Sequence, residues 1–403
     1  MPSTLPEGDP APRDGSLPDA ALTELPDHRF GIYLHVPFCR TRCGYCDFNT
    51  YTAAELGPGA SRSDYVDSAL AELDLAARVL GDRVPRVDTV FVGGGTPTLL
   101  PPTELGRLLG GVGERFGLAD DAEVTTESNP DSVSAADLAR LREAGFTRIS
   151  FGMQSAAEHV LRVLDREHTP GRAQQAVAEA RAAGFDQVSL DLIFGTPGET
   201  LDDWRVSLQA VLDAEVDHVS AYALIVEEGT RLASRIRRRE LPAPDDDDLA
   251  DKYLLAEEML SAQGFSAYEV SNWARTPQAR CRHNLAYWRG DNWWGIGPGA
   301  HSHIGGVRFW NVKHPTAYAG RLVAGESPAY AREALDAETR RMERVLLELR
   351  LADGLPLAVL TDSERSRVTD PVRRGLAELR DDRLVLTLTG RLLADGVVRD
   401  LLD

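Results

Sequence analysis

The sequence predicts an α/β fold, in which about six βα units form a parallel barrel or part-barrel and a C-terminal α+β region follows. Three observations support this prediction. Apolar segments of strand length recur up to about position 230, amphipathic helical patterns lie between them, and one helix-to-strand junction is repeated. The chain of 403 residues is long enough for two domains with a large core.

The predicted strands are short and rich in apolar residues, and several end at glycine or proline. In chain order they are residues 29–37, 87–95, 122–130, 146–154, 185–195 and 216–225. Residues 134–145 and 171–184 between them have the spacing of amphipathic helices. Strands that alternate with such helices indicate βα units and a parallel sheet.

An internal echo supports the same architecture. Residues 142–150 and 181–189 share the pattern R-x-A-G-F-x-x-[IV]-S. At each site a helix ends and a strand begins, and we expect Gly145 and Gly184 to adopt the left-handed conformation that closes a helix. Parallel α/β folds bind ligands at the carboxyl ends of their strands, so we expect the functional site there.

The pattern changes after about residue 230. Four aspartates at 245–248 are interpreted as a solvated linker and the first turn of a helix. From about residue 335, helices followed by a hairpin indicate a small winged-helix-like module. The predicted division is a disordered leader at 1–27, a part-barrel at 28–235 and a C-terminal domain at 236–403.

Composition narrows the function. A net charge of −19 argues against nucleic acid as a partner, because phosphate binding needs a basic surface. No apolar run approaches the ~20 residues that span a bilayer. The start of the sequence lacks the basic and apolar regions of a secretory signal. We therefore expect a cytoplasmic protein.

The loop after the first predicted strand gathers thiols. Three of the cysteines lie close together in a C-x3-C-x2-C pattern: Cys39, Cys43 and Cys46. In a reducing compartment such a cluster indicates metal ligands. Structural zinc needs four ligands, so His35, Asp47 or Cys281 would have to supply the fourth. A [4Fe–4S] cubane held by three thiolates would keep one iron open for a small ligand. The spacing leaves both metals open.

Several motifs carry a family resemblance. "CRTRCGYC" resembles the cluster loop of radical S-adenosylmethionine (SAM) enzymes, and "GGGTP" at 93–97 resembles their GGE-type motif. "YLHVPFC", "GGGTPT", "ESNP", "FGMQS", "DLIFGTPGET" and "HNLAYW" are similar, in order, to motifs of the oxygen-independent coproporphyrinogen oxidase-like group. The resemblance covers residues 29–400 and implies a [4Fe–4S] cluster whose open iron is chelated by SAM.

The resemblance also implies a set of SAM contacts. They are Tyr33, Tyr45, Gly94, Gly95, Thr96, Glu127, Gln154, Arg166 and Asp191. Acidic and amide side chains suit the amino and hydroxyl groups of SAM, and Arg166 suits its carboxylate. Tyr45 would pack on the adenine. Asp191 also stands out without the resemblance, because a carboxylate within an apolar strand is unfavourable unless it has a partner.

One position departs from the oxidase pattern. The oxidases carry a further cysteine shortly after the third cluster cysteine, and this chain has Phe48 there. The match therefore shifts to the related HemW-type heme chaperones, which bind heme and pass it to acceptor hemoproteins such as respiratory enzymes. Within "HNLAYW", His283 becomes a candidate axial ligand of heme iron. His301 and His303 are weaker candidates, and Cys281 is interpreted as incidental.

The resemblance leaves alternatives. The chain would be a heme chaperone whose partners are heme and acceptor hemoproteins, with membrane contact only through those partners. Whether it is also an enzyme stays open. The second interpretation is a radical SAM oxidative decarboxylase of coproporphyrinogen III, or another enzyme of porphyrin biosynthesis. The third is a non-catalytic zinc or scaffold protein.

Overall fold

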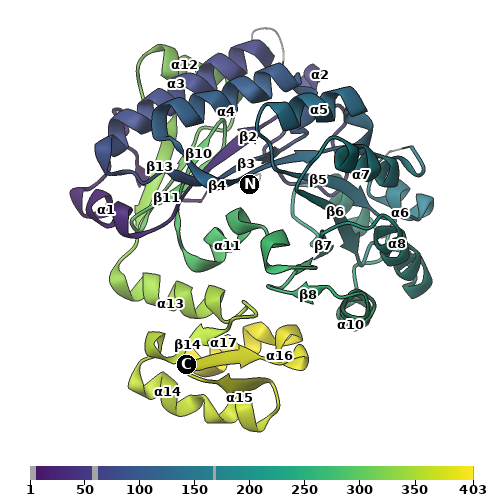
Figure 1. Cartoon of the computed structure of the whole chain (residues 1–403). Helices are drawn as coiled ribbons and strands as arrows, with labels where there is room; N and C mark the ends of the chain where they lie inside the picture. The colour runs from purple at the N-terminus through teal and green to yellow at the C-terminus, as the bar shows by residue number, and fades with distance from the viewer. Residues whose placement is uncertain (1–5, 57–61, 167–168, 403) are drawn as a thin grey trace.

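The computed structural model describes residues 6–56, 62–166 and 169–402. Its frame is a curved, open sheet whose described strands run in the order β1-β13-β12-β11-β10-β2-β3-β4-β5-β6-β7-β9-β8 (Figure 1). The central strands are parallel: β10 (Asn292–Ile296), β2 (Phe30–Val36), β3 (Val87–Gly94), β4 (Leu118–Ser128), β5 (Arg148–Gln154), β6 (Gln187–Phe194) and β7 (His218–Ala223). All six predicted strands are present, as β2 to β7. The predicted α/β part-barrel is confirmed.

Helices cover the outer face of this sheet (Figure 1). They are α3 (Arg62–Leu80), α4 (Pro102–Phe116), α5 (Ala135–Glu143), α6 (Glu158–Val163), α7 (Arg172–Ala182) and α8 (Leu201–Asp213), and a short α2 (Ala53–Leu56) precedes them. Ser134 and Thr200 form capping boxes that fix the starts of α5 and α8. Gly145 and Gly184 have φ of 109° and 86°, so the predicted left-handed helix ends are confirmed.

The sheet continues beyond β2 as antiparallel strands. After β10 come β11 (His301–Ile304), β12 (Val307–Asn311) and β13 (Ala329–Ala334), and β1 (Asp9–Pro10) pairs with the edge of β13. Helix α1 (Asp19–Glu24) follows β1 in the chain, and Ala21 and Leu25 are buried in the main core. The expectation of a disordered leader is therefore wrong for residues 6–27, whereas residues 1–5 lie outside the described part. Composition cannot reveal a strand whose pairing partner lies in a distant part of the sequence.

The other edge of the sheet and the opening of the part-barrel are covered by residues after β7. These are α9 (Arg231–Arg237), α10 (Asp246–Ala262), β8 (Ser266–Ala267), β9 (Asn272–Ala274) and α11 (Arg282–Arg289). Helix α12 (Pro315–Val323) instead packs against α3 on the outer side of the molecule (Figure 1). Asp245 caps α10, as the acidic run predicted. One hydrophobic core runs from Ala21 to Ala329. The boundary expected at 235/236 therefore does not divide two cores, because β9 and β10 extend the same sheet.

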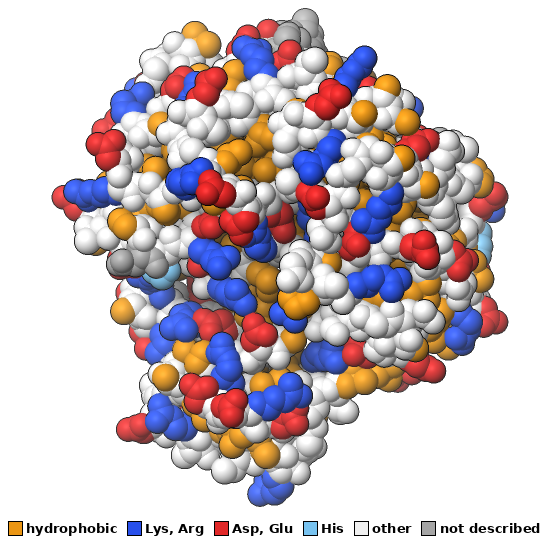
Figure 2. Space-filling model, viewed as in Figure 1, with side chains coloured by type: hydrophobic (Ala, Val, Ile, Leu, Met, Phe, Trp, Pro, Cys, Tyr) orange, Lys and Arg blue, Asp and Glu red, His pale blue; other side chains and the backbone are white. Residues whose placement is uncertain are grey.

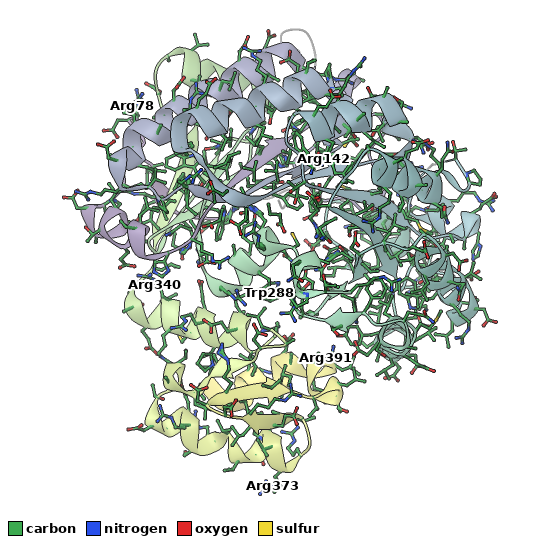
Figure 3. The ribbon with its side chains drawn as sticks, viewed as in Figure 1. Arg78, Arg142, Trp288, Arg340, Arg373 and Arg391 are labelled. Carbon is green, nitrogen blue, oxygen red and sulfur yellow. The ribbon has the colours of Figure 1, made fainter. Side chains whose placement is uncertain are left out.

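A second, smaller core belongs to the C-terminal module. It contains α13 (Ala337–Glu348), β14 (Leu355–Pro356), α14 (Asp362–Arg367), α15 (Thr369–Arg373), β15 (Ala377–Arg380), β16 (Arg383–Leu386), α16 (Leu388–Leu392) and α17 (Ala394–Leu402). The three strands form an antiparallel sheet, which agrees with the predicted helix-and-hairpin module. Arg340 and Arg391, labelled in Figure 3, join the module to Glu24 and Glu257 of the main body, at 2.7 and 3.2 Å.

The outer surface mixes both signs of charge. Acidic and basic side chains are interspersed over the face shown in Figure 2. Within the described ranges, no helix is both long and apolar enough to cross a bilayer.

Candidate functional site

A cavity of about 1480 Å³ opens along the carboxyl ends of the parallel strands. Each of the six strands β2 to β7 contributes to its wall, respectively through Tyr33, Gly94, Glu127, Gln154, Asp191 and Tyr222. All of the SAM contacts and cluster cysteines expected from the sequence line this cavity, as do Cys281 and His283. The structure thus brings together residues from widely separated parts of the sequence.

The loop that carries the three thiols follows β2, and backbone hydrogen bonds join its two ends. The backbone N–H of Cys39 donates to the Tyr51 carbonyl at 3.0 Å, and that of Tyr51 donates to the Pro37 carbonyl at 2.7 Å. All three thiols are free and half-buried. Burial and the neighbouring Cys46 raise the pKa of Cys39 to about 11. A bound metal cation would lower this pKa again, because its positive charge stabilises a buried thiolate.

Three thiols on one loop fit a cluster, in which each thiolate binds its own iron. Among the described residues, no group of three or more His, Cys, Asp or Glu side chains is arranged to hold one metal ion. Structural zinc requires four ligands that converge on one point. In a cubane each thiolate binds its own iron, so the thiols need not converge. A Cβ added at Gly95 would lie 2.4 Å from the Phe38 carbonyl oxygen and 2.9 Å from the Cys39 sulfur, so this backbone packs directly against the loop.

Buried polar groups line the wall next to the cysteine loop. The backbone N–H of Gly94 donates to Glu127 Oε2 at 3.1 Å, and Ser150 Oγ donates to Asp191 Oδ1 at 2.8 Å. Burial, with a contribution from the Asp191 charge, raises the pKa of Glu127 to about 7. Burial also raises the pKa of Asp191. These carboxyl groups would therefore gain from a ligand that donates hydrogen bonds or carries positive charge.

Several polar atoms that line this cavity are buried without a hydrogen-bond partner among the described residues. They include Gln154 Oε1, Arg166 Nε and Thr125 Oγ1. Arg166 also donates to the Gly152 carbonyl at 3.2 Å and to Cys43 Sγ at 3.4 Å, so it lies between the wall and the cysteine loop. Gln154 holds a left-handed φ of 61°. Buried polar atoms in native proteins are normally paired, so this wall is suited to a polar ligand.

His283 lies in the cavity wall on α11, which occupies the concave side of the sheet (Figure 1). Its side chain is fully enclosed, and both ring nitrogens have partners: Nδ1 and Thr89 Oγ1 at 2.8 Å, Nε2 and the Tyr287 hydroxyl at 2.9 Å. Burial lowers its pKa to about 3. Axial ligation of heme by His283 stays a prediction, and it would require one of these hydrogen bonds to break. His301 and His303 do not line the cavity.

Two residues of the site were not foreseen from the sequence. Glu123, on β4, accepts hydrogen bonds from the backbone N–H groups of Arg282 and His283 at 2.9 and 3.0 Å, and so holds the start of α11. The thiol of Cys281 points at the same carboxylate, at 3.6 Å. Arg148, on β5, is buried and donates to the Ala279 carbonyl at 2.7 Å. The sequence did offer a signal: both residues are charged and fall within predicted strands, and a charged side chain that is buried in a strand requires a partner.

The chain is similar to known proteins over most of its length. Residues 33–211 match the model of the radical SAM superfamily. Heme chaperone HemW of Mycobacterium tuberculosis is 56% identical over 94% of this chain and 97% of its own length. The heme chaperones HemW of Bacillus subtilis and Escherichia coli are each 32% identical, over 91% and 94% of this chain. The structure of coproporphyrinogen III oxidase (HemN) from Escherichia coli aligns with a TM-score of 0.80 at 22% identity over 96% of this chain and 94% of its own, which shows a shared fold.

Proposed function

Since the chain belongs to the HemW heme chaperone family of the radical SAM superfamily, we propose that it binds heme and passes it to acceptor hemoproteins. The observation that carries the proposal is 56% identity to a heme chaperone over 94% of the chain. We further propose that the acceptors include respiratory enzymes and that the transfer takes place in the cytoplasm, with membrane contact only through those partners.

The cavity residues fit the cofactors of the superfamily. Cys39, Cys43 and Cys46 would each supply one thiolate to a [4Fe–4S] cluster. When bound, this cluster offers an open iron to the amino and carboxylate groups of SAM. Arg166, with its unpaired Nε, would bind the SAM carboxylate, and Glu127 and Asp191 would accept hydrogen bonds from its amino and hydroxyl groups.

The remaining expected contacts shape the same site. Gly94, Gly95 and Thr96 line the cavity and would bring backbone close to the methionine end of SAM. A Cβ at Gly95 would collide with the Phe38 carbonyl, so glycine is needed there for this backbone to pack against the cysteine loop. Tyr45, which packs with a small apolar cluster, would face the adenine. Tyr33 and Gln154 would complete the wall.

We propose that the chain is not a coproporphyrinogen oxidase. The cysteine that follows the cluster motif in the oxidases is replaced by Phe48, which lines the cavity and exposes its ring. A phenyl ring has no thiol to take part in ligation or redox chemistry, so this side chain can contribute only apolar contact.

The test uses protein with a reconstituted cluster and saturating SAM. We expect about one heme per chain with a Soret band, and transfer of that heme to an apo-hemoprotein. The same preparation should not decarboxylate coproporphyrinogen III. Failure to bind heme, or robust decarboxylation, would overturn the proposal.

A further inference from the structure

The cavity is larger than a single ligand needs. Pockets for drug-sized ligands, the size class of SAM, enclose roughly 300–1,000 Å³. A cavity of about 1480 Å³ therefore has room for a second ligand beside SAM. The buried polar wall described above suits SAM, so the second ligand is expected toward the opening.

Apolar side chains are exposed at this opening. Phe48, on the cysteine loop, exposes 43% of its surface, and Ile225, just after β7, exposes 69%, although both line the cavity. Leu232, on the helix α9 that follows Ile225 in the chain, donates its backbone N–H to the Gly44 carbonyl of the cysteine loop at 2.8 Å, so the chain after β7 meets that loop. Exposed apolar side chains that line a cavity indicate a contact surface for an apolar ligand.

Arg40 adds an uncompensated positive charge to the cavity. It follows Cys39, lines the cavity and is exposed, and within the described part of the chain it has no ion pair or hydrogen bond. Nearby arginines are engaged: Arg42 donates to the Thr50 carbonyl at 2.7 Å, and Arg231 pairs with Asp165 at 3.3 Å. A free guanidinium is well suited to bind a carboxylate.

We propose that heme binds at the mouth of this cavity, beside SAM, with its ring against Phe48 and Ile225 and a propionate on Arg40. The chemistry matches, because heme is a planar apolar ring that carries two carboxylates. This inference rests on the proposed function for the identity of the ligand. It adds that heme contacts lie on the cysteine loop and after β7, and that SAM and heme bind together.

The charge contact is tested with two porphyrins. Heme and its dimethyl ester, which lacks both negative charges, are titrated against SAM-loaded protein and followed at the Soret band. Arg40→Gln should weaken heme binding about tenfold, the value of one charged hydrogen bond, and should leave ester binding unchanged. Arg78→Gln is the matched control: Arg78 is exposed on α3, on the outer face of the molecule (Figure 3), and should change neither affinity.

The apolar contact is tested with two separate substitutions. Phe48→Ser and Ile225→Ser should each weaken heme and its ester alike, by about fivefold or more, because both ligands keep the ring. Ile225 lies far along the chain from the cysteines, so its result holds even if Phe48→Ser disturbs the cluster. Val323→Ser, at an exposed apolar position on α12, is the control and should have no effect.

The outcomes separate this inference from the function on which it rests. Heme affinity that is unchanged in Arg40→Gln and Ile225→Ser, while the wild type binds heme, would overturn the mouth site and spare the chaperone proposal. Displacement of heme by saturating SAM would also overturn it. A wild-type protein that binds no heme would overturn both proposals.

Discussion

Glu127, Asp191 and His283 are ionisable side chains buried around one cavity. Burial raises the pKa of the two carboxyl groups and lowers the pKa of His283, so that it favours the neutral form of each. The two carboxyl groups would be stabilised as anions by a cationic ligand. SAM carries a sulfonium cation, so its charge complements this wall. His283 differs, because neutral imidazole already satisfies its two hydrogen bonds to Thr89 and Tyr287.

The thiols provide the first residue-scale prediction. After anaerobic reconstitution we expect about four irons and four sulfides per chain. Single Ser substitutions at Cys39, Cys43 or Cys46 should remove most of the iron. Cys281→Ser should leave the iron content unchanged, because its thiol faces Glu123 at 3.6 Å. Iron and sulfide analysis decides, and full retention in all three loop variants would refute the assignment.

The second residue-scale prediction concerns the pH dependence of SAM binding. With a pKa of about 7, Glu127 is largely protonated in the free protein at about pH 5.5 and ionises as the pH rises. SAM affinity should therefore increase from about pH 5.5 to about pH 7.5, below the titration of a typical α-amino group. Glu127→Gln should bind SAM about tenfold to a hundredfold more weakly at the upper pH and should lose much of this dependence.

Isothermal titration at several pH values checks this prediction. A pH profile of Glu127→Gln that matches the wild type would show that another group controls binding. Asp191→Asn is a useful comparison, because Asp191 accepts from Ser150 and contributes to the raised pKa of Glu127. We expect the apparent pKa for SAM binding to fall in that variant.

At the scale of elements, α11 lies on the concave side of the sheet and is anchored there by one buried carboxylate, that of Glu123. Glu123 accepts from the first two N–H groups of the helix, where the helix dipole also favours negative charge. The helix in turn carries His283 and Tyr287 into the cavity wall. The position of this wall therefore depends on a residue that contacts no proposed ligand.

The third prediction tests this anchor. Glu123→Ala should lower the free energy of unfolding by about 1–3 kcal/mol, because it leaves two backbone donors without their acceptor. Glu123→Gln, which keeps one acceptor oxygen, should lose less. Asp121→Ala is the matched control: it breaks the solvent-exposed 3.0 Å pair with Arg282 and should lose only about 0–1 kcal/mol. Denaturant unfolding gives the energies.

Hydrogen exchange shows where the effect acts. In Glu123→Ala the amides of Arg282 and His283 should exchange faster than in the wild type. Equal protection of these amides in the two proteins would contradict the anchoring role.

Local sequence patterns were sufficient to predict the strands whose signal lies within a short stretch of sequence. Strands β2 to β7 overlap the predicted segments because apolar periodicity and terminal glycines are local signals. Strand β1 was missed because it pairs with β13, which belongs to a distant part of the sequence. At the site, the cluster cysteines and the expected SAM contacts, all of which line the cavity, followed from motifs. Glu123 and Arg148 did not, because their hydrogen-bond partners are equally remote in the chain.

On the scale of the whole molecule, one buried acid joins the outer helix α3 to the antiparallel extension of the sheet. Glu72, on α3, accepts from the Gly297 N–H at 2.8 Å, from Asn311 Nδ2 at 2.7 Å and from the Tyr318 hydroxyl at 2.5 Å. These partners follow β10, end β12 and lie on α12. Burial raises the pKa of Glu72 to about 7 despite these three donors.

The fourth prediction follows from this shift. The folded pKa of about 7 lies above the ordinary value of 4.5, so the folded protein holds the proton more tightly than the unfolded chain. The stability that Glu72 contributes is thus complete below about pH 4.5 and is lost as the pH rises through about 7. A shift of this size corresponds to about 3 kcal/mol. Glu72→Gln cannot titrate, so the loss of stability between about pH 5 and about pH 8 should shrink by that order.

Tryptophan fluorescence during denaturant unfolding is a suitable measurement, because all of the tryptophans lie between positions 204 and 310 and report on the main body rather than the C-terminal module. Glu114→Gln is the control, since Glu114 is exposed on α4 and should leave the pH dependence unchanged. If Glu72→Gln lost as much stability as the wild type over this pH range, the titrating group would have to be sought elsewhere. Glu127 and Glu199, whose pKa values burial also raises to about 7, would be the next to test, because an acid with a raised folded pKa gives the same direction of change.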